Sequence, residues 1–267
     1  MMPQNVFDPI VRPCLSAPTA EDHKYSRGKV AVISGAMAGA AMLAAAAAQR
    51  CGAGYVSLLG GAAFGPPYAL VREAWHARSL ADPRIGAVVI GPGLGLDAKA
   101  ADCLEVAIAS DHSLVIDADA LTLLARAGGP ARLKGRAAPV ILTPHEGEFA
   151  RLFGTSDGER VDRARGAASV SGAIVVLKGS RSVVAAPSGE IAVADVASPW
   201  LATAGTGDVL SGIVGTMLAQ RQIHGGGTFA AARAALWLHA DAARRAGVVL
   251  IADDLIIHLP AAVAACL

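Results

Sequence analysis

Short apolar runs recur along this chain, and each gives way to a polar or glycine-rich turn and then to a helical pattern. The runs lie at residues 30–34, 55–59, 85–90, 114–116, 140–142 and 174–177. Apolar runs of this length between turn signals are typical of buried strands. Strands that alternate with helices favour an α/β fold with a mostly parallel sheet and helices on both faces.

The remaining segments fit around such a sheet. Residues 183–186 and 191–194, joined through Pro187-Ser-Gly189, predict a small antiparallel hairpin. Helices are expected after the strands, also at residues 66–77, and three times near the C-terminus, at about 208–220, 228–246 and 253–264. No repeat or linker divides residues 23–267, so we expect one domain. Prolines interrupt residues 1–22, which we expect to be an irregular leader.

Composition excludes several classes of protein. The chain is 54% hydrophobic and 17% charged, which excludes disorder and predicts a large core. A net charge of +1 without a basic run argues against a nucleic-acid partner. No apolar segment is long enough for a membrane span, and the start lacks a signal sequence. The four scattered cysteines indicate buried thiols in a reducing compartment. We therefore expect a cytoplasmic protein.

Polar and glycine-rich pieces follow the predicted strands at their carboxyl ends. These pieces are Gly91 to Gly95, Asp117, His145, Lys178 and the turn Thr203 to Asp208. Open α/β sheets bind ligands at this edge. The pieces are therefore expected to line one crevice.

The turn Thr203 to Asp208 leads into an apolar helix. Gly205 and Gly207 let the backbone approach a ligand, and the unpaired N–H groups of the helix start favour an anion. Asp208 is the only acid between Asp195 and Asp241. It either caps the helix or acts as a base beside a bound phosphate, and the residues alone leave both open.

Three other strand ends carry residues with two interpretations each. Lys178 is either a snorkelling surface group or a point charge for phosphate, and its neighbours Gly179 and Arg181 favour phosphate. His145 is either a cap or a donor to a substrate. Asp117 and Asp119 either cap their helix or contact a ligand.

Other enzyme classes are poorly supported. Gly93-Leu-Gly95 with Asp117 partly matches a dinucleotide-binding fingerprint, but it lies in the middle of the sheet and leaves the Thr203–Asp208 turn unexplained. The sequence contains no P-loop. His145-Glu146 lacks the second histidine of a zinc helix, and no serine stands in a nucleophile elbow.

Eight motifs follow one another along the chain: His23-Lys-Tyr-Ser-Arg-Gly28, Ala38-Gly-Ala-Ala41, Gly52-Ala-Gly54, Gly91-Pro-Gly-Leu-Gly95, Asp117-Ala-Asp-Ala-Leu121, Thr143-Pro-His-Glu-Gly-Glu148, Leu177-Lys-Gly179 and Gly205-Thr-Gly-Asp208. In kind and in order they resemble the motifs of the ADP- or ATP-dependent NAD(P)H-hydrate dehydratases of the ribokinase-like superfamily. The resemblance covers about residues 23–265. The Gly-Thr-Gly-Asp element alone is shared with many related kinases, whereas its combination with Thr-Pro-His-x-Gly-Glu is specific.

The resemblance implies a ribokinase-like fold and a reaction that restores NADH or NADPH from the S form of its hydrate. It implies substrate contacts at Ala40, Gly93, Gly95 and His145, with Asp208 facing the substrate as the catalytic residue. The positions that it implies for the adenine nucleotide are Lys178, Gly179, Ser180, Arg181, Ser182, Gly205, Thr206 and Gly207.

The same resemblance implies ADP or ATP as phosphoryl donor, Mg²⁺ as its companion, and a homo-oligomer, by family resemblance a tetramer. The sequence leaves the choice between ADP and ATP open, although the single-domain organisation suggests ADP. The loop Gly35 to Gly39 is shorter than in many members, which leaves its contacts open, and we expect no fused epimerase domain. Two alternatives remain: a related thiazole or hydroxymethylpyrimidine kinase, and a nucleotide-binding module without activity.

Overall fold

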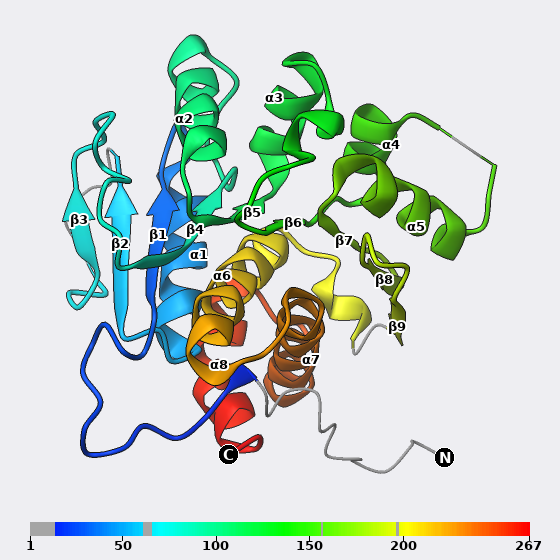
Figure 1. Cartoon of the computed structure of the whole chain (residues 1–267). Helices are drawn as coiled ribbons and strands as arrows, with labels where there is room; N and C mark the ends of the chain where they lie inside the picture. The colour runs from blue at the N-terminus through cyan, green and yellow to red at the C-terminus, as the bar shows by residue number, and fades with distance from the viewer. Residues whose placement is uncertain (1–13, 61–65, 156, 196–197) are drawn as a thin grey trace, which may run out of the picture.

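The computed structural model describes residues 14–60, 66–155, 157–195 and 198–267 (Figure 1). The first part of the expected leader, residues 1–13, lies outside the described residues. Residues 15–22 form no helix or strand, as expected. Cys14 and Leu15 are nevertheless buried in the core, so this end of the leader packs against the domain.

One mixed sheet forms the centre of the domain. Its nine strands lie in the order β3-β2-β1-β4-β5-β6-β7-β8-β9. The strands are β1 Lys29–Ile33, β2 Tyr55–Leu59, β3 Val71–Glu73, β4 Ile85–Ile90, β5 Ser113–Ile116, β6 Val140–Leu142, β7 Ile174–Leu177, β8 Arg181–Ala185 and β9 Ile191–Asp195. Strands β1 to β7 pair in parallel, and β8 and β9 complete the sheet as an antiparallel hairpin. The predicted fold class is confirmed.

Helices cover both faces of this sheet. They are α1 Ala38–Arg50, α2 Ala98–Ala109, α3 Ala118–Arg126, α4 Glu146–Phe153, α5 Arg160–Ser171, α6 Thr206–His224, α7 Thr228–Ala246 and α8 Ala252–Ala264. Short 3₁₀ turns lie at η2 Pro130–Leu133 and η3 Pro199–Leu201. Helices α2 to α5 lie on one face, and α1, α6, α7 and α8 lie on the other (Figure 1).

Side chains that alternate along each strand form two hydrophobic cores, one between the sheet and each layer of helices. Val30 and Val32 of β1 face the layer of α1 and α6, whereas Ala31 and Ile33 face the layer of α2 and α3. Successive side chains of a strand point to opposite faces, so a wholly apolar strand is buried on both. Burial on both faces explains why the strands appear in the sequence as apolar runs.

Three expectations about single elements were wrong. Residues 66–77 do not form a helix, because β3 pairs there in parallel with β2 at the edge of the sheet. Helix α5 was not expected, because the residues that it buries are all small: Ala164, Ala167, Ala168 and Ser171. Helix α6 begins at Thr206, two residues before Asp208, because Gly205 turns the chain in a left-handed conformation with φ of 88°.

Helices α1 and α6 approach each other to backbone contact. A Cβ added to Gly212 would lie 2.0 Å from the carbonyl oxygen of Ala44. Thr216 of α6 also donates a hydrogen bond to the carbonyl of Ala48. The alanine-rich sequence of α1 therefore allows this helix to pack closely against α6 as well as against the sheet. This contact fixes the start of α6 relative to the carboxyl ends of the strands.

We expect Gly212→Ala to destabilise the protein by about 1–3 kcal/mol, because backbone atoms of α1 cannot move out of the way of the new Cβ. The matched control is Gly166→Ala in α5, where a Cβ meets nothing within 4 Å. That change should stabilise the helix by up to about 1 kcal/mol. Urea unfolding of both variants measures the difference. Equal stability of the two variants would contradict the close α1–α6 contact.

Candidate active site at the carboxyl ends of the strands

The segments expected to converge lie at the ends of β4, β5, β6 and β7, next to the start of α6 (Figure 1). In a parallel sheet the carboxyl ends of all strands meet at one edge, so residues far apart in sequence become neighbours. Each segment also follows a strand with buried side chains, which fixes where its polar residues emerge.

The turn before α6 is held from several sides. Gly205 is the N-cap residue, and a Cβ there would lie 2.7 Å from Leu43 and 2.8 Å from Ala252. The hydroxyl of Thr206 donates to the carbonyls of Leu201, at 2.8 Å, and Thr203, at 3.1 Å. The first N–H groups of the helix have no intrahelical acceptor, and they favour an anion.

His239 of α7 supports the same turn. Its Nε2 lies 2.9 Å from the carbonyl oxygen of Thr206, and because a carbonyl only accepts, Nε2 carries the proton. Burial lowers the pKa of His239 to about 4, so the ring is neutral near pH 7. The sequence analysis missed this residue, since a single histidine in an apolar helix carries no motif.

Lys178 lies among carboxylates at the end of β7. Its Nζ is 2.8 Å from Oδ1 of Asp117 and 3.8 Å from Oε2 of Glu148. A Cβ added to Gly207 would lie 3.4 Å from the same Nζ, so the ammonium group faces the start of α6. Burial opposes the charged form of Lys178, but the nearby carboxylates overcome it and raise the pKa. The lysine is therefore a positive charge inside the site, and the snorkelling alternative is wrong.

Arg160 of α5 holds the backbone beside this lysine. Its guanidinium donates to the carbonyls of Leu177 and Lys178, and it also pairs with Glu146. The sequence analysis did not identify it, because it lies in a helix whose pattern was not recognised. Lys178 is thus fixed both through its side chain and through its main chain.

Asp208 lies in the first turn of α6, and Gly205 occupies the cap position instead. Within the described part of the chain, its carboxylate accepts no hydrogen bond. Burial, followed by the negative charge of Asp117, raises the pKa of Asp208 to about 6. The carboxylate form therefore predominates near pH 7, and its proton affinity is higher than that of an ordinary aspartate. These properties suit a general base.

His145 caps α4. Its Nδ1 accepts hydrogen bonds from the N–H groups of Gly147, at 3.0 Å, and Glu148, at 3.3 Å. The Glu148 carboxylate accepts in return from the His145 N–H at 2.8 Å, which completes a capping box. The proton of the ring then resides on Nε2, 3.3 Å from Oε1 of Glu148. The side chain is 58% exposed, so the cap does not exclude a donor role for Nε2.

The remaining predicted substrate residues lie in the loop 91–95 and at the start of α1, and these two segments are in contact. The N–H of Met37 donates to the carbonyl of Gly93 at 2.8 Å, just before α1, which contains Ala40. Gly93 has φ of 60°, and an added Cβ would lie 2.2 Å from the Met37 carbonyl. The carboxylate of Asp119 accepts from the N–H of Gly95 at 2.9 Å. Asp119 therefore holds a loop, and neither it nor Asp117 makes a side-chain cap.

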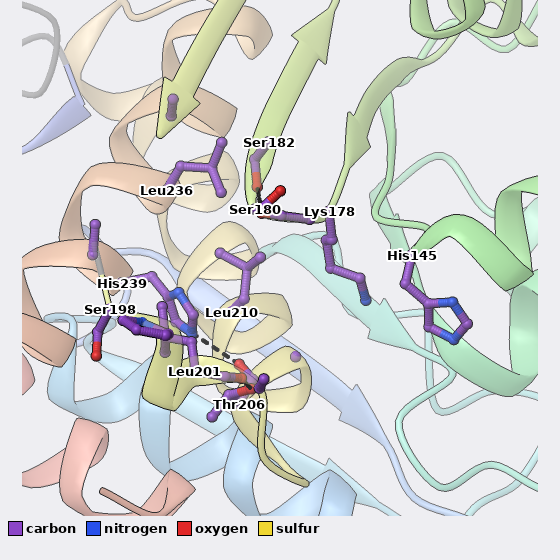
Figure 2. A pocket seen from close by; sticks show the side chains of 16 residues that line it. His145, Lys178, Ser180, Ser182, Ser198, Leu201, Thr206, Leu210, Leu236 and His239 are labelled. Carbon is purple, nitrogen blue, oxygen red and sulfur yellow. Dashed lines mark hydrogen bonds between the residues drawn. The ribbon is translucent and has the colours of Figure 1, made fainter. Parts of the chain in front are cut away.

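A pocket of about 600 Å³ opens between β7, β8, α6 and α7 (Figure 2). Its predicted members are His145, Lys178, Gly179, Ser180, Ser182, Thr206 and Gly207. Apolar side chains from Leu201, Leu210 and Leu236 line it together with His239 (Figure 2). Ala40, Gly93, Gly95, Arg181, Gly205 and Asp208 are not among its lining residues.

Among the described residues, no group of three or more His, Cys, Asp or Glu side chains is arranged to hold a metal ion. Within the same ranges, no helix is long and apolar enough to cross a membrane.

Comparison with known proteins gives one consistent result. The sequence model of a family described as NAD(P)H-hydrate dehydratase matches residues 30–254. A bifunctional NAD(P)H-hydrate repair enzyme of Mycobacterium leprae is 41% identical over 210 residues, which are 76% of this chain and 43% of that protein. The chain thus spans about half the length of the bifunctional relatives that it matches.

Two further proteins resemble more of the chain. The ADP-dependent (S)-NAD(P)H-hydrate dehydratase of Neisseria meningitidis is 40% identical over 243 residues, covering 84% of this chain and 79% of that protein. The structure of the ADP/ATP-dependent NAD(P)H-hydrate dehydratase of Bacillus subtilis, co-crystallised with ATP and Mg²⁺, superposes with a TM-score of 0.81. That match has 27% identity and covers 96% of each chain.

The raised pKa of Asp208 has a consequence for stability. The folded state raises this pKa from 3.8 to about 6. The contribution of Asp208 to the stability of the protein is therefore fully present below pH 4 and is lost as the pH rises through 6. Asp208→Asn removes the buried charge, so it should stabilise the protein at pH 8 by on the order of 2 kcal/mol and have little effect near pH 4. Urea unfolding at both pH values measures this.

The control is Asp253→Asn, which removes an exposed acid from the first turn of α8. An exposed acid at a helix start is favourable, so this change should cost up to about 1 kcal/mol at pH 8. A loss of stability in both variants at pH 8 would show that Asp208 is an ordinary helix-start acid.

Proposed function

The chain belongs to the NAD(P)H-hydrate dehydratase family, and from this we infer that it removes water from the S form of hydrated NADH or NADPH. An adenine nucleotide serves as phosphoryl donor, and the product is the intact reduced cofactor. The enzyme is thus a lyase that repairs nicotinamide nucleotides.

One arrangement of residues carries this proposal. At one edge of the sheet lie a fixed lysine, a helix start whose first N–H groups have no intrahelical acceptor, and an aspartate with a pKa of about 6. Lys178 and Gly207 line the pocket, while Asp208 follows Gly207 directly. Phosphoryl transfer requires positive charge around the phosphates and a base for the attacking hydroxyl, and this arrangement supplies both.

In the proposed mechanism, Asp208 accepts the proton of the hydroxyl on the carbon beside the ring nitrogen. The oxygen forms a bond to the terminal phosphorus of the nucleotide, and the bond to the leaving nucleotide breaks. The lone pair of the ring nitrogen then expels phosphate. Loss of a proton from the adjacent carbon restores the dihydropyridine ring, so the net change is loss of water coupled to hydrolysis of the nucleotide.

We propose the binding sites from the family resemblance, and the residues that line the pocket support part of them. Lys178, Gly179, Ser180, Arg181, Ser182, Gly205, Thr206 and Gly207 form the proposed nucleotide site. Ala40, Gly93, Gly95 and His145 form the proposed substrate site, next to Asp208. Leu201, Leu210 and Leu236 give the pocket an apolar wall, which suits the base of an adenine nucleotide.

We propose ADP as the donor, because the Neisseria relative carries ADP dependence in its name and is 40% identical. Among the described residues, no group of three or more His, Cys, Asp or Glu side chains could hold a metal ion without the nucleotide. We therefore propose that Mg²⁺ accompanies the nucleotide, held by its phosphate oxygens, and no step depends on a protein-bound ion. A cytoplasmic homo-oligomer remains a proposal from the family resemblance, and light scattering with size-exclusion chromatography tests its assembly.

The activity is tested by incubating the protein with hydrated NADH and either ADP or ATP, and by following dihydronicotinamide absorbance and phosphate release.

Asp208→Asn should keep the fold and lower turnover in this assay by about 10²–10⁴-fold, because no base remains for the hydroxyl. Asp253→Asn should retain turnover. Near wild-type turnover of Asp208→Asn would remove Asp208 from the base role. A stable phosphorylated alcohol as product would indicate a kinase, and binding without turnover a nucleotide-binding module.

Lys178→Ala should weaken ADP binding by about 10- to 100-fold, since a charge-assisted hydrogen bond to phosphate contributes about 1.5–3 kcal/mol. Isothermal calorimetry measures the affinity, and Lys134→Ala, which alters an exposed lysine after η2, is the control. Thermal unfolding is measured in parallel, because the change leaves the Asp117 carboxylate without its cation. Unchanged ADP affinity in a folded Lys178→Ala variant would exclude the phosphate contact.

A further inference from the structure

Asp117 is a buried carboxylate that the proposed mechanism does not use. It is only 1% exposed, although it follows β5 at the edge of the site. Oδ1 accepts from Lys178 Nζ at 2.8 Å, and Oδ2 accepts from the Ser211 hydroxyl at 2.6 Å. Its partners thus come from the end of β7 and from α6, so the single carboxylate joins three elements of the fold.

The side chain does not serve its own helix. Asp117 occupies the N-cap position of α3, where an aspartate commonly accepts from the helix N–H groups, but it makes no such bond. Ala118, the next residue, has φ of 45°, in the left-handed region that alanine avoids. The local chain is therefore held in an unfavourable conformation while the carboxylate points to Lys178 and Ser211.

Both partners of Asp117 contact the start of α6. The Nζ of Lys178 would lie 3.4 Å from a Cβ on Gly207. The hydroxyl of Ser211 lies within 3.2 Å of the carbonyl of Gly207. Asp117 thus connects the lysine and the helix turn that together form the proposed phosphate site. Glu148 is the alternative carboxylate for Lys178, but at 3.8 Å it lies farther away.

We propose that Asp117 is a positioning residue, which holds Lys178 against the first turn of α6 and anchors that turn through Ser211. This inference rests on the proposed function for its kinetic part, because it assigns Lys178 and α6 to phosphoryl transfer. Misplacement of such groups by about 1 Å is known to cost about 100-fold in rate.

The Asp117 carboxylate also acts on Asp208, through its negative charge. The charged groups that influence Asp208 are Asp117, Lys178, Glu148 and Asp119. After burial, the negative charge of Asp117 is the largest cause of the raised pKa of Asp208. Removing this charge should therefore lower the pH at which Asp208 loses its proton. This effect depends on the charge of Asp117, and a change that leaves the charge in place should not move the titration.

The test uses Asp117→Asn, which keeps the shape of the side chain and removes its charge. We expect kcat to fall by about 10- to 100-fold. ADP affinity should be unchanged or tighter, because Lys178 loses a competing anion. The ¹³C NMR titration of the Asp208 carboxyl should move to lower pH, and the acid limb of the pH–rate profile should move with it. Ser211→Ala should lower kcat by a few-fold and leave the Asp208 titration unchanged, because Asp117 keeps its charge.

The control is Asp97→Asn, at the N-cap of α2, whose carboxylate bonds only the N–H of Ala100 among the described residues. It should lower stability without moving the Asp208 titration. Parallel losses of kcat, ADP affinity and stability in Asp117→Asn would overturn the proposal, as would an unchanged kcat and titration. ADP binding and the NMR titration require no turnover. An inactive wild-type protein would therefore refute the proposed function while these measurements still test the placement of Lys178.

Discussion

The ion pair between Lys178 and Asp117 organises the interior of the site. An isolated ammonium or carboxylate in the core is strongly unfavourable, and neither group is solvated well here. Their 2.8 Å contact offsets that cost, and it also fixes where a positive charge stands relative to α6. Arg160 holds the main chain of Lys178, so the lysine has little freedom to leave. The position of the charge is therefore a property of the fold.

Helix α6 couples this charge to the rest of the molecule. Its start borders the pocket, while Gly212 and Thr216 contact the backbone of α1 and Gly215 lies against Val89 of the sheet. Small residues at these points allow a helix to lie close to both neighbours, and close packing resists displacement. The first turn of α6 therefore has a defined position at the strand ends, which a site with fixed donors requires.

Most strands could be predicted, because a strand buried on both faces is apolar at nearly every position. The strand β3 could not, because its three residues are held at the sheet edge by pairing with β2, a tertiary contact that the local pattern does not contain. The segments of the site were found by their place at strand ends. Their contacts were not, since Asp117 meets Lys178 61 positions away and Ser211 94 positions away. His239 was missed for the same reason, because its role comes only from the packing of α7 on α6.

Asp208 is available to accept a proton because of the way in which its helix starts, and two other helix starts show the difference. Glu148, Asp254 and Asp208 occupy the same position, three residues after the N-cap of α4, α8 and α6. The first two accept hydrogen bonds from their N-cap N–H groups, at 2.8 Å in each case. In α6 the cap residue is Gly205 in a left-handed conformation, and Asp208 forms no such bond within the described chain. Without that bond to stabilise its charged form, burial and the neighbouring carboxylates determine its pKa. The glycine that opens the helix start to a phosphate is thus also the residue that leaves Asp208 free to accept a proton.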